Sequence, residues 1–207
     1  MDNQIYYLAI MSAIISFLGF VLEDVWLAFR KGFIDNRNMT FPLLFGYGLF
    51  IISFYLIIGT PEAFILMGAK KLRSSAARYV TYFLMTFLIV SVGEIVLGKI
   101  TEWYFGFSYW NYEKIPLHVT KYTSIPTSIG FSLIITSFMG KCFVPILSIV
   151  KRIPIGIARV IAIASTVIMV SDMIVSFGKM HRTHELNIRH VIPIRKSLRL
   201  AKASDKE

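Results

Sequence analysis

The feature that most constrains this chain is a series of long runs without a charged residue. Four runs hold no Asp, Glu, Lys or Arg and a fifth holds a single acid; they cover residues 5–22, 39–61, 79–93, 122–140 and 160–178. A helix that spans a bilayer needs about 20 mostly apolar residues. The chain is 56% hydrophobic and only 16% charged, which is too apolar for a soluble domain of this size. The sequence therefore predicts an integral membrane protein.

We expect an all-α fold, a polytopic transmembrane bundle of about five spans, because helices satisfy their own backbone hydrogen bonds in lipid. One transmembrane domain should cover residues 1–178, with spans near 5–29, 42–59, 79–105, 128–150 and 156–178, and a basic tail over 179–207. Pro145 should kink or end the fourth span. The basic connector at residues 62–78 is typical of a short interfacial helix. The first span lacks a basic segment before it and a cleavage site after it, so we interpret it as a retained helix.

Composition restricts the functional classes. The lone cysteine, Cys142, supports neither an internal disulfide nor a cysteine metal site, and we expect no metal and no cofactor. The net charge is +10, and eight of the 22 basic residues lie in 179–207. A basic tail beside a span predicts contact with anionic membrane lipids, and no nucleic-acid role is expected. The localisation that follows is a multi-pass protein of the cell membrane. The positive-inside rule favours an external N-terminus by a small margin.

Five acids lie within or at the edge of the apolar segments, all toward the C-terminal end of odd-numbered spans: Glu23, Asp24, Glu94, Glu102 and Asp172. If every segment crosses once, all five carboxyls fall in the same half of the bilayer. A charged side chain at the bilayer centre costs roughly 2.5–3.5 kcal/mol on insertion scales. The functional interpretation is a proton- or cation-handling path, or an acid–base pair, with Glu94 as the deepest member. The structural interpretation is a set of paired groups that hold helices together.

The loops after the first and third spans add polar and aromatic candidates. Arg37 is placed to read an anionic group, and Trp110, Tyr112 and His118 lie in the longer loop. These residues form either a lid over a carboxylate cavity or an aromatic belt at the membrane interface.

Two parts of the chain share a similar sequence pattern. Pro42-x-x-x-Gly46-Tyr47-x-Leu49-x-Ile51 recurs as Pro126-x-x-x-Gly130-Phe131-x-Leu133-x-Ile135. Each copy opens an even-numbered span and follows an acid-bearing span with a Gly-Phe pair in its loop. The pattern indicates either a duplicated helix pair, as in parallel-repeat transporters, or independent use of the same helix-start chemistry.

These loop motifs resemble a bacterial family called putative ABC-transporter permease, type IV. The resemblance covers roughly residues 15–140 and rests on these motifs: Asn36-Arg37-Asn38-Met39, Gly46-Tyr47-Gly48, Gly93-Glu94, Tyr109-Trp110-Asn111-Tyr112 and Ile125-Pro126-Thr127-Ser128. The segment at residues 41–46 is shorter than the family's usual pattern, so the chain resembles a divergent branch. The resemblance implies a transport role, with a separate ATPase subunit or further copies of the chain as candidate partners.

Three functional hypotheses follow. The first is a transporter or permease-like subunit with an intramembrane carboxylate site. The second is an intramembrane enzyme that modifies a lipid or isoprenoid, with Glu94 and Glu23 as acid and base, and the third is a non-catalytic assembly or sensor subunit. The sequence contains no phosphate loop, no H-E-x-x-H and no G-x-S-x-G, so it lacks those common hydrolytic signatures.

Overall fold

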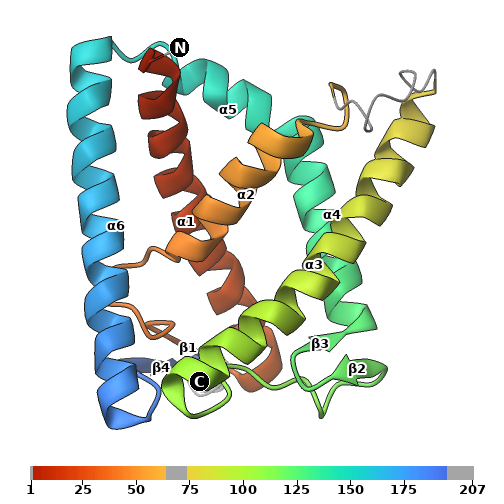
Figure 1. The fold of residues 1–207 in the computed structure, drawn as a ribbon, viewed down its shortest axis with the longest axis vertical. Helices are drawn as coiled ribbons and strands as arrows, with labels where there is room; N and C mark the ends of the chain where they lie inside the picture. The colour runs from red at the N-terminus through yellow and green to blue at the C-terminus, as the bar shows by residue number, and fades with distance from the viewer. Residues whose placement is uncertain (1, 64–73, 195–207) are drawn as a thin grey trace, which may run out of the picture. The chain divides into compact units, whose positions relative to one another are not determined.

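The computed structural model describes residues 2–63 and 74–194, and this part of the chain is mainly helical (Figure 1). Its helices are α1 Asp2–Lys31, α2 Phe45–Ile58, α3 Ser75–Phe105, α4 Ile125–Lys141, α5 Phe143–Val150 and α6 Ile155–Thr183. The predicted all-α fold is confirmed. Most of the connector predicted as an interfacial helix lies outside the described residues, since residues 64–73 are not described.

Three of the described helices, α1, α3 and α6, are long and apolar enough to cross a membrane. Helices α4 and α5 form a fourth span if the bent pair is counted as one. The break lies at Cys142, with a bend of 49°. Pro145 explains it, because a proline ring collides with the carbonyl group four residues earlier, here that of Lys141. Helix α2 has only 14 residues, or about 21 Å at 1.5 Å per residue, so the count of five spans stays a prediction.

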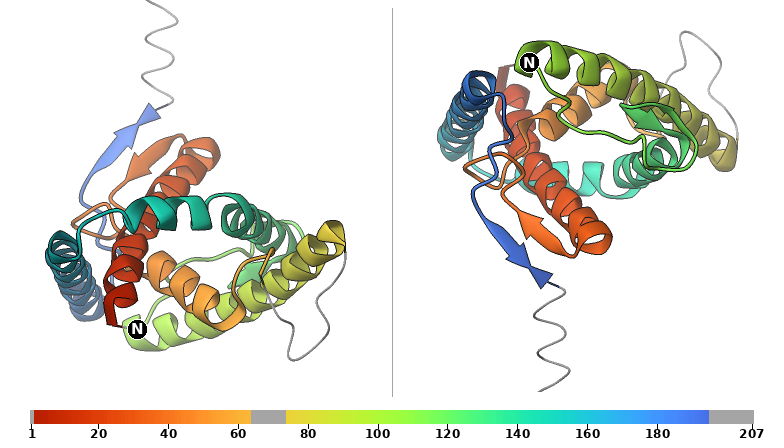
Figure 2. Two further views of the ribbon diagram at one scale, coloured as in Figure 1. Left: turned by 90° about the horizontal axis from the view of Figure 1, so that it is seen from above. Right: turned by 90° about the horizontal axis from the view of Figure 1, so that it is seen from below.

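Two short antiparallel strand pairs accompany the helices. Strand β1 (Phe33–Asp35) pairs with β4 (Val191–Pro193), as Figure 2 shows, and β2 (His118–Thr120) pairs with β3 (Thr123–Ser124). The residues expected as a tail are thus partly structured, because α6 continues to Thr183 and β4 follows it.

The chain forms two compact units, which are described separately. Unit 1 comprises Met1–Phe50 with Pro154–Glu207, and unit 2 comprises Ile51–Ile153. In unit 1, α1 packs along α6 (Figure 1). In unit 2, α3 packs against α4, and the fully buried side chains of Tyr82, Thr86 and Met139 lie on these helices.

A close helix approach in unit 1 depends on Gly48. A Cβ atom at this position would overlap the carbonyl oxygen and hydroxyl of Ser12 and the hydroxyl of Ser16. Nearby, the backbone N–H of Leu44 donates to the carbonyl of Ser16 at 3.0 Å. Small residues let helix backbones approach in membranes, so this glycine sets how closely the start of α2 lies on α1.

We predict that Gly48→Ala lowers the stability of the protein in detergent, measured by thermal unfolding. Overpacking costs about 1–3 kcal/mol, which exceeds the roughly 1 kcal/mol that alanine gains over glycine within a helix. Gly46→Ala is the matched control, since a Cβ there meets nothing within 4 Å. Equal effects of the two substitutions would contradict the close approach.

Candidate intramembrane carboxylate sites

Glu94 in unit 2 lies at the centre of a small oxygen cluster. Its Oε2 accepts a hydrogen bond from Thr123 Oγ1 at 2.6 Å and another from Ser128 Oγ at 3.2 Å. The two hydroxyl oxygens are themselves 3.0 Å apart. Thr123 and Ser128 are 2% and 1% exposed, so the hydroxyls serve this carboxyl group rather than solvent.

The start of α4 explains how these hydroxyls reach Glu94. Ser124 is the N-cap and accepts a hydrogen bond from the backbone N–H of Thr127, and Pro126 occupies the first turn, where a missing N–H costs nothing. Strand β3 ends at this cap and places Thr123 beside Glu94. The first turn of α4 places Ser128 there. The local sequence Thr-Ser-Ile-Pro-Thr-Ser is therefore both a helix start and the source of the donors.

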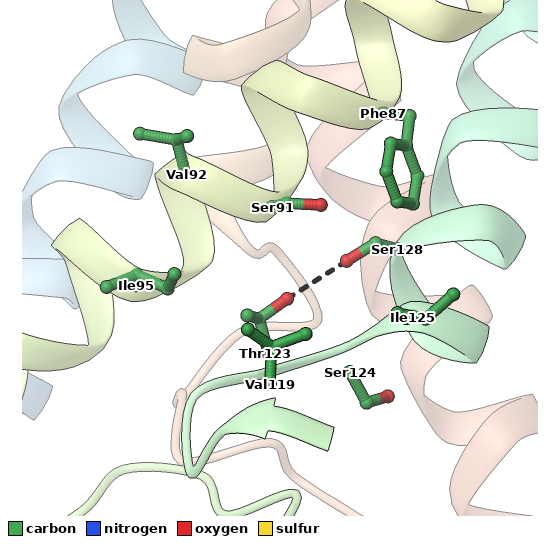
Figure 3. A pocket seen from close by; sticks show the side chains of 9 residues that line it. All are labelled: Phe87, Ser91, Val92, Ile95, Val119, Thr123, Ser124, Ile125 and Ser128. Carbon is green, nitrogen blue, oxygen red and sulfur yellow. Dashed lines mark hydrogen bonds between the residues drawn. The ribbon is translucent and has the colours of Figure 1, made fainter. Parts of the chain in front are cut away.

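A cavity of about 290 Å³ adjoins this cluster (Figure 3). Thr123 and Ser128 line it together with Ser91 of α3, and in Figure 3 the three hydroxyls point toward a common space. The remaining wall is mainly apolar, from Phe87, Val92, Ile95, Val119 and Ile125. The cavity thus offers a few hydroxyls in an otherwise hydrophobic surface.

Glu102, two turns after Glu94 on α3, is held by the same loop. Its carboxylate accepts hydrogen bonds from Lys121 Nζ at 2.8 Å and from the Tyr122 hydroxyl. These bonds raise the pKa of the Lys121 ammonium and the pKa of the Tyr122 phenol. The Tyr122 ring packs on Gly98, one turn before Glu102, where a Cβ would overlap it. The indole N–H of Trp110 donates to the Tyr122 carbonyl at 2.8 Å and fixes this part of the loop.

Glu23 in unit 1 has an equivalent set of partners. Its Oε1 accepts a hydrogen bond from the Tyr47 hydroxyl at 2.5 Å, and its Oε2 lies 2.9 Å from Arg37 Nη2. The Tyr47 ring packs on Gly19, again one turn before the glutamate. Asp35 fixes the backbone of Arg37, because its carboxylate accepts a hydrogen bond from the backbone N–H of Arg37 at 2.7 Å.

The two arrangements share one design, which we call the glycine–tyrosine clamp. Each clamp consists of a helical Gly-x-x-x-Glu, a tyrosine whose ring covers the glycine and whose hydroxyl binds the glutamate, and a basic side chain on the other carboxylate oxygen. Each clamp-bearing helix is also followed by a left-handed glycine and a phenylalanine, at Gly32 and Gly106. The clamps thus attach each loop to the helix that precedes it.

Asp172 of α6 has a different role from the clamp acids. Its carboxylate accepts the backbone N–H of Thr40 at 3.0 and 3.1 Å, that of Phe41 at 2.8 Å, and the Ser176 hydroxyl at 3.1 Å. Asp172 is 6% exposed. A buried carboxylate with several donors is well stabilised, so Asp172 anchors the loop that leads into α2.

The remaining predicted residues, Asp24, Tyr112 and His118, lie outside the clamps and the Glu94 cluster. Asp24 accepts a weak hydrogen bond from the backbone N–H of Asp35 at 3.4 Å. The backbone N–H of Tyr112 donates to the carbonyl of Lys121 at 2.8 Å. His118 is exposed on β2, with its Nδ1 at 3.3 Å from the Ile115 carbonyl. No group of three potential metal-ligating side chains occurs within residues 2–63 and 74–194.

Sequence reasoning missed the groups that satisfy these acids: Tyr47, Lys121, Tyr122, Thr123 and Ser128. Threonine, serine and tyrosine are too common to stand out in a sequence. The repeated Gly-x-x-x-Glu spacing at Gly19–Glu23 and Gly98–Glu102 was the available signal, because residues four apart share a helix face.

We predict that double-mutant cycles will detect a favourable coupling within each clamp. The first cycle combines Tyr47→Phe with Glu23→Gln and measures stability; a hydrogen bond to a charged group is worth about 1.5–3 kcal/mol. The second combines Tyr122→Phe with Glu102→Gln and should show coupling of the same sign. Additive effects in both cycles would show that the tyrosines and glutamates act independently.

Comparison with known proteins agrees with the membrane character of these helices. The model of the family described as "Putative ABC-transporter type IV" matches residues 10–177. No curated protein and no solved structure shows a significant match. The matched range includes both clamps, Glu94 and Asp172, and covers most of the chain. The chain is a membrane-embedded protein that belongs to this ABC-transporter type IV family.

Proposed function

We propose that the protein is a transporter or permease-like subunit and that Glu94 is its intramembrane functional group. The observation that carries this proposal is the hydroxyl cluster around Glu94 on a long apolar helix. Glu94 lies eleven residues before the end of α3, or about 16 Å along the helix axis. Polar groups at membrane depth are costly and mark substrate or ion pathways.

In this proposal the chain crosses the membrane five times, with α2 as the short second crossing. The α1–α2 and α3–α4 segments are duplicated helix pairs. The glycine–tyrosine clamps support that relation, because each has the same parts around a glutamate near the end of the first helix of its pair. Transporters built from repeats place their sites on discontinuous or interrupted helices, and the break at Cys142 between α4 and α5 fits that pattern.

The partners follow from the family and from the sequence. The chain contains no G-x-x-x-x-G-K-[ST] motif, so a Walker-type ATP site would have to come from a separate ATPase subunit. Further copies of the same chain are the alternative partner. Exposed apolar side chains along α3 and α6, such as Leu88, Trp103 and Val160, are suited to membrane lipids.

We predict that Glu94→Gln abolishes the function while leaving the protein folded and inserted. The amide keeps the shape and accepts hydrogen bonds from Thr123 and Ser128, but it cannot exchange a proton or hold a cation. The assay is complementation of a deletion strain, scored on the metabolites or tolerances that the deletion alters, with membrane abundance measured in parallel.

Glu113→Gln is the control, because Glu113 is an exposed loop acid. Wild-type behaviour of Glu94→Gln at normal abundance would show that Glu94 is a packing residue. Loss of function in both variants would indicate a general sensitivity to charge. A lipid that copurifies in stoichiometric amount and is displaced by Glu94→Gln would instead favour the lipid-modifying enzyme.

A further inference from the structure

The three oxygens of the Glu94 cluster make three contacts at hydrogen-bond distance, but the two hydroxyls have only two protons to donate. Glu94 Oε2, Thr123 Oγ1 and Ser128 Oγ form a triangle with edges of 2.6, 3.0 and 3.2 Å. Each hydroxyl carries one proton to donate. If the carboxylate is ionised and both hydroxyls donate to it, no proton remains for the contact between Thr123 and Ser128.

Protonation of Glu94 supplies the proton that the third contact lacks. The carboxyl O–H donates to one hydroxyl, that hydroxyl donates to the other, and the second hydroxyl donates back to the carboxyl group. Each of the three oxygen–oxygen contacts then has one proton, and every oxygen both donates and accepts one hydrogen bond. We infer that the Glu94 site binds a proton, which closes a ring of hydrogen bonds with Thr123 and Ser128. This inference deepens the proposed function, since it makes the proton the ion that the Glu94 site handles.

The surroundings favour a proton over a metal cation. Metal ions such as Ca²⁺ take 6–8 oxygen ligands, several of them carboxylates. The ring itself consists of one carboxyl oxygen and two hydroxyls, and the wall of the adjoining cavity is mainly apolar. A carboxyl group in such surroundings is stabilised by becoming neutral rather than by remaining charged and desolvated.

The ionisable residues closest to the ring along the chain lie on the segments that form it or pack beside it. On α3 they are Lys99 and Glu102, on β2 there is His118, and the turn before β3 carries Lys121 and Tyr122. Lys121 and Tyr122 are both bonded to Glu102. Lys121, the basic residue of this turn, is therefore bonded to Glu102, and Lys141 of α4 lies in the last turn of its helix, whereas Ser128 lies in the first.

The cavity beside the cluster bounds the ring of hydrogen bonds on one side. Thr123 and Ser128 face both Glu94 and the cavity, and Ser91 adds a third hydroxyl to the wall. Thr123 and Ser128 are only 2% and 1% exposed, so the wall that they share with the cavity is almost wholly apolar. The ring of hydrogen bonds is thereby separated from the cavity by apolar side chains, which favours the neutral form of the carboxyl group.

Infrared spectroscopy of the purified protein in lipid nanodiscs tests this directly. The wild-type minus Glu94→Gln difference spectrum at neutral pH should contain the C=O stretch of a protonated carboxyl group, and Glu113→Gln should leave that band in place. Thr123→Val removes one donor and should shift the band to higher frequency. If Glu94→Gln is poorly folded, Glu94→Asp serves instead and should displace the band.

An ionised Glu94 at neutral pH, seen as a carboxylate band alone, would overturn the inference. So would a protonated band that disappears when K⁺ is exchanged for Na⁺ at constant pH, because a metal cation would then be the ligand. The readout needs no transport assay. A normal band with a fully functional Glu94→Gln variant would reject the proposed function and leave the proton site standing.

Discussion

The structure depends on one constraint: an acid on an apolar helix must be supplied with hydrogen-bond donors. Solvent cannot supply them in hydrocarbon, and unmatched buried polar groups are costly. For the glutamates of α1 and α3 the donors come from the segment that follows the acid-bearing helix, whereas Asp172 of α6 takes backbone donors from Thr40 and Phe41. Glu23 receives Arg37 and Tyr47, Glu94 receives Thr123 and Ser128, and Glu102 receives Lys121 and Tyr122. These bonds hold the segment that follows each helix against the helix.

That constraint links local sequence to function. Gly19 and Gly98 have no side chain, so a tyrosine ring can lie directly on the helix and its hydroxyl can reach the glutamate one turn later. The clamps fix the loop ends, and in unit 2 the same loop carries Thr123 to Glu94 only one residue after the clamp tyrosine. A change in the charge of Glu94 or Glu102 would therefore alter the bonds that hold this loop. If the protein is the proposed permease-like subunit, ion binding at Glu94 would be coupled to the position of this loop through adjacent residues.

The sequence predicted the helical framework well because apolar runs and prolines act locally. The spans expected at 5–29, 79–105 and 156–178 lie within α1, α3 and α6, which extend beyond the charge-free runs, and Pro145 marked the region of the break that the structure has at Cys142. The acids were also identified, because a charge in an apolar run is conspicuous. Their partners were not, since the pairing of Glu94 with Thr123 joins residues 29 positions apart through the fold. Trp110 was expected in a lid or an interfacial belt, and the hydrogen bond from its indole N–H to the Tyr122 carbonyl was not foreseen. The pairing of β4 with β1 likewise joins distant segments that no local pattern connects.

Disulfide formation between α3 and the following loop would show whether the loop lies on the helix that carries the acids. In a Cys142→Ala background, Gly98→Cys combined with Tyr122→Cys places two thiols where a Cβ on Gly98 would lie 2.8 Å from the Tyr122 Cβ, within about 1 Å of the usual Cβ separation in a disulfide. Mild oxidation of membranes should protect both thiols from maleimide labelling in this variant. Gly93→Cys with Tyr122→Cys should remain labelled, because a Cβ at Gly93 meets nothing within 4 Å. Equal labelling of both pairs after oxidation would show that the loop does not lie on α3 and would contradict the account.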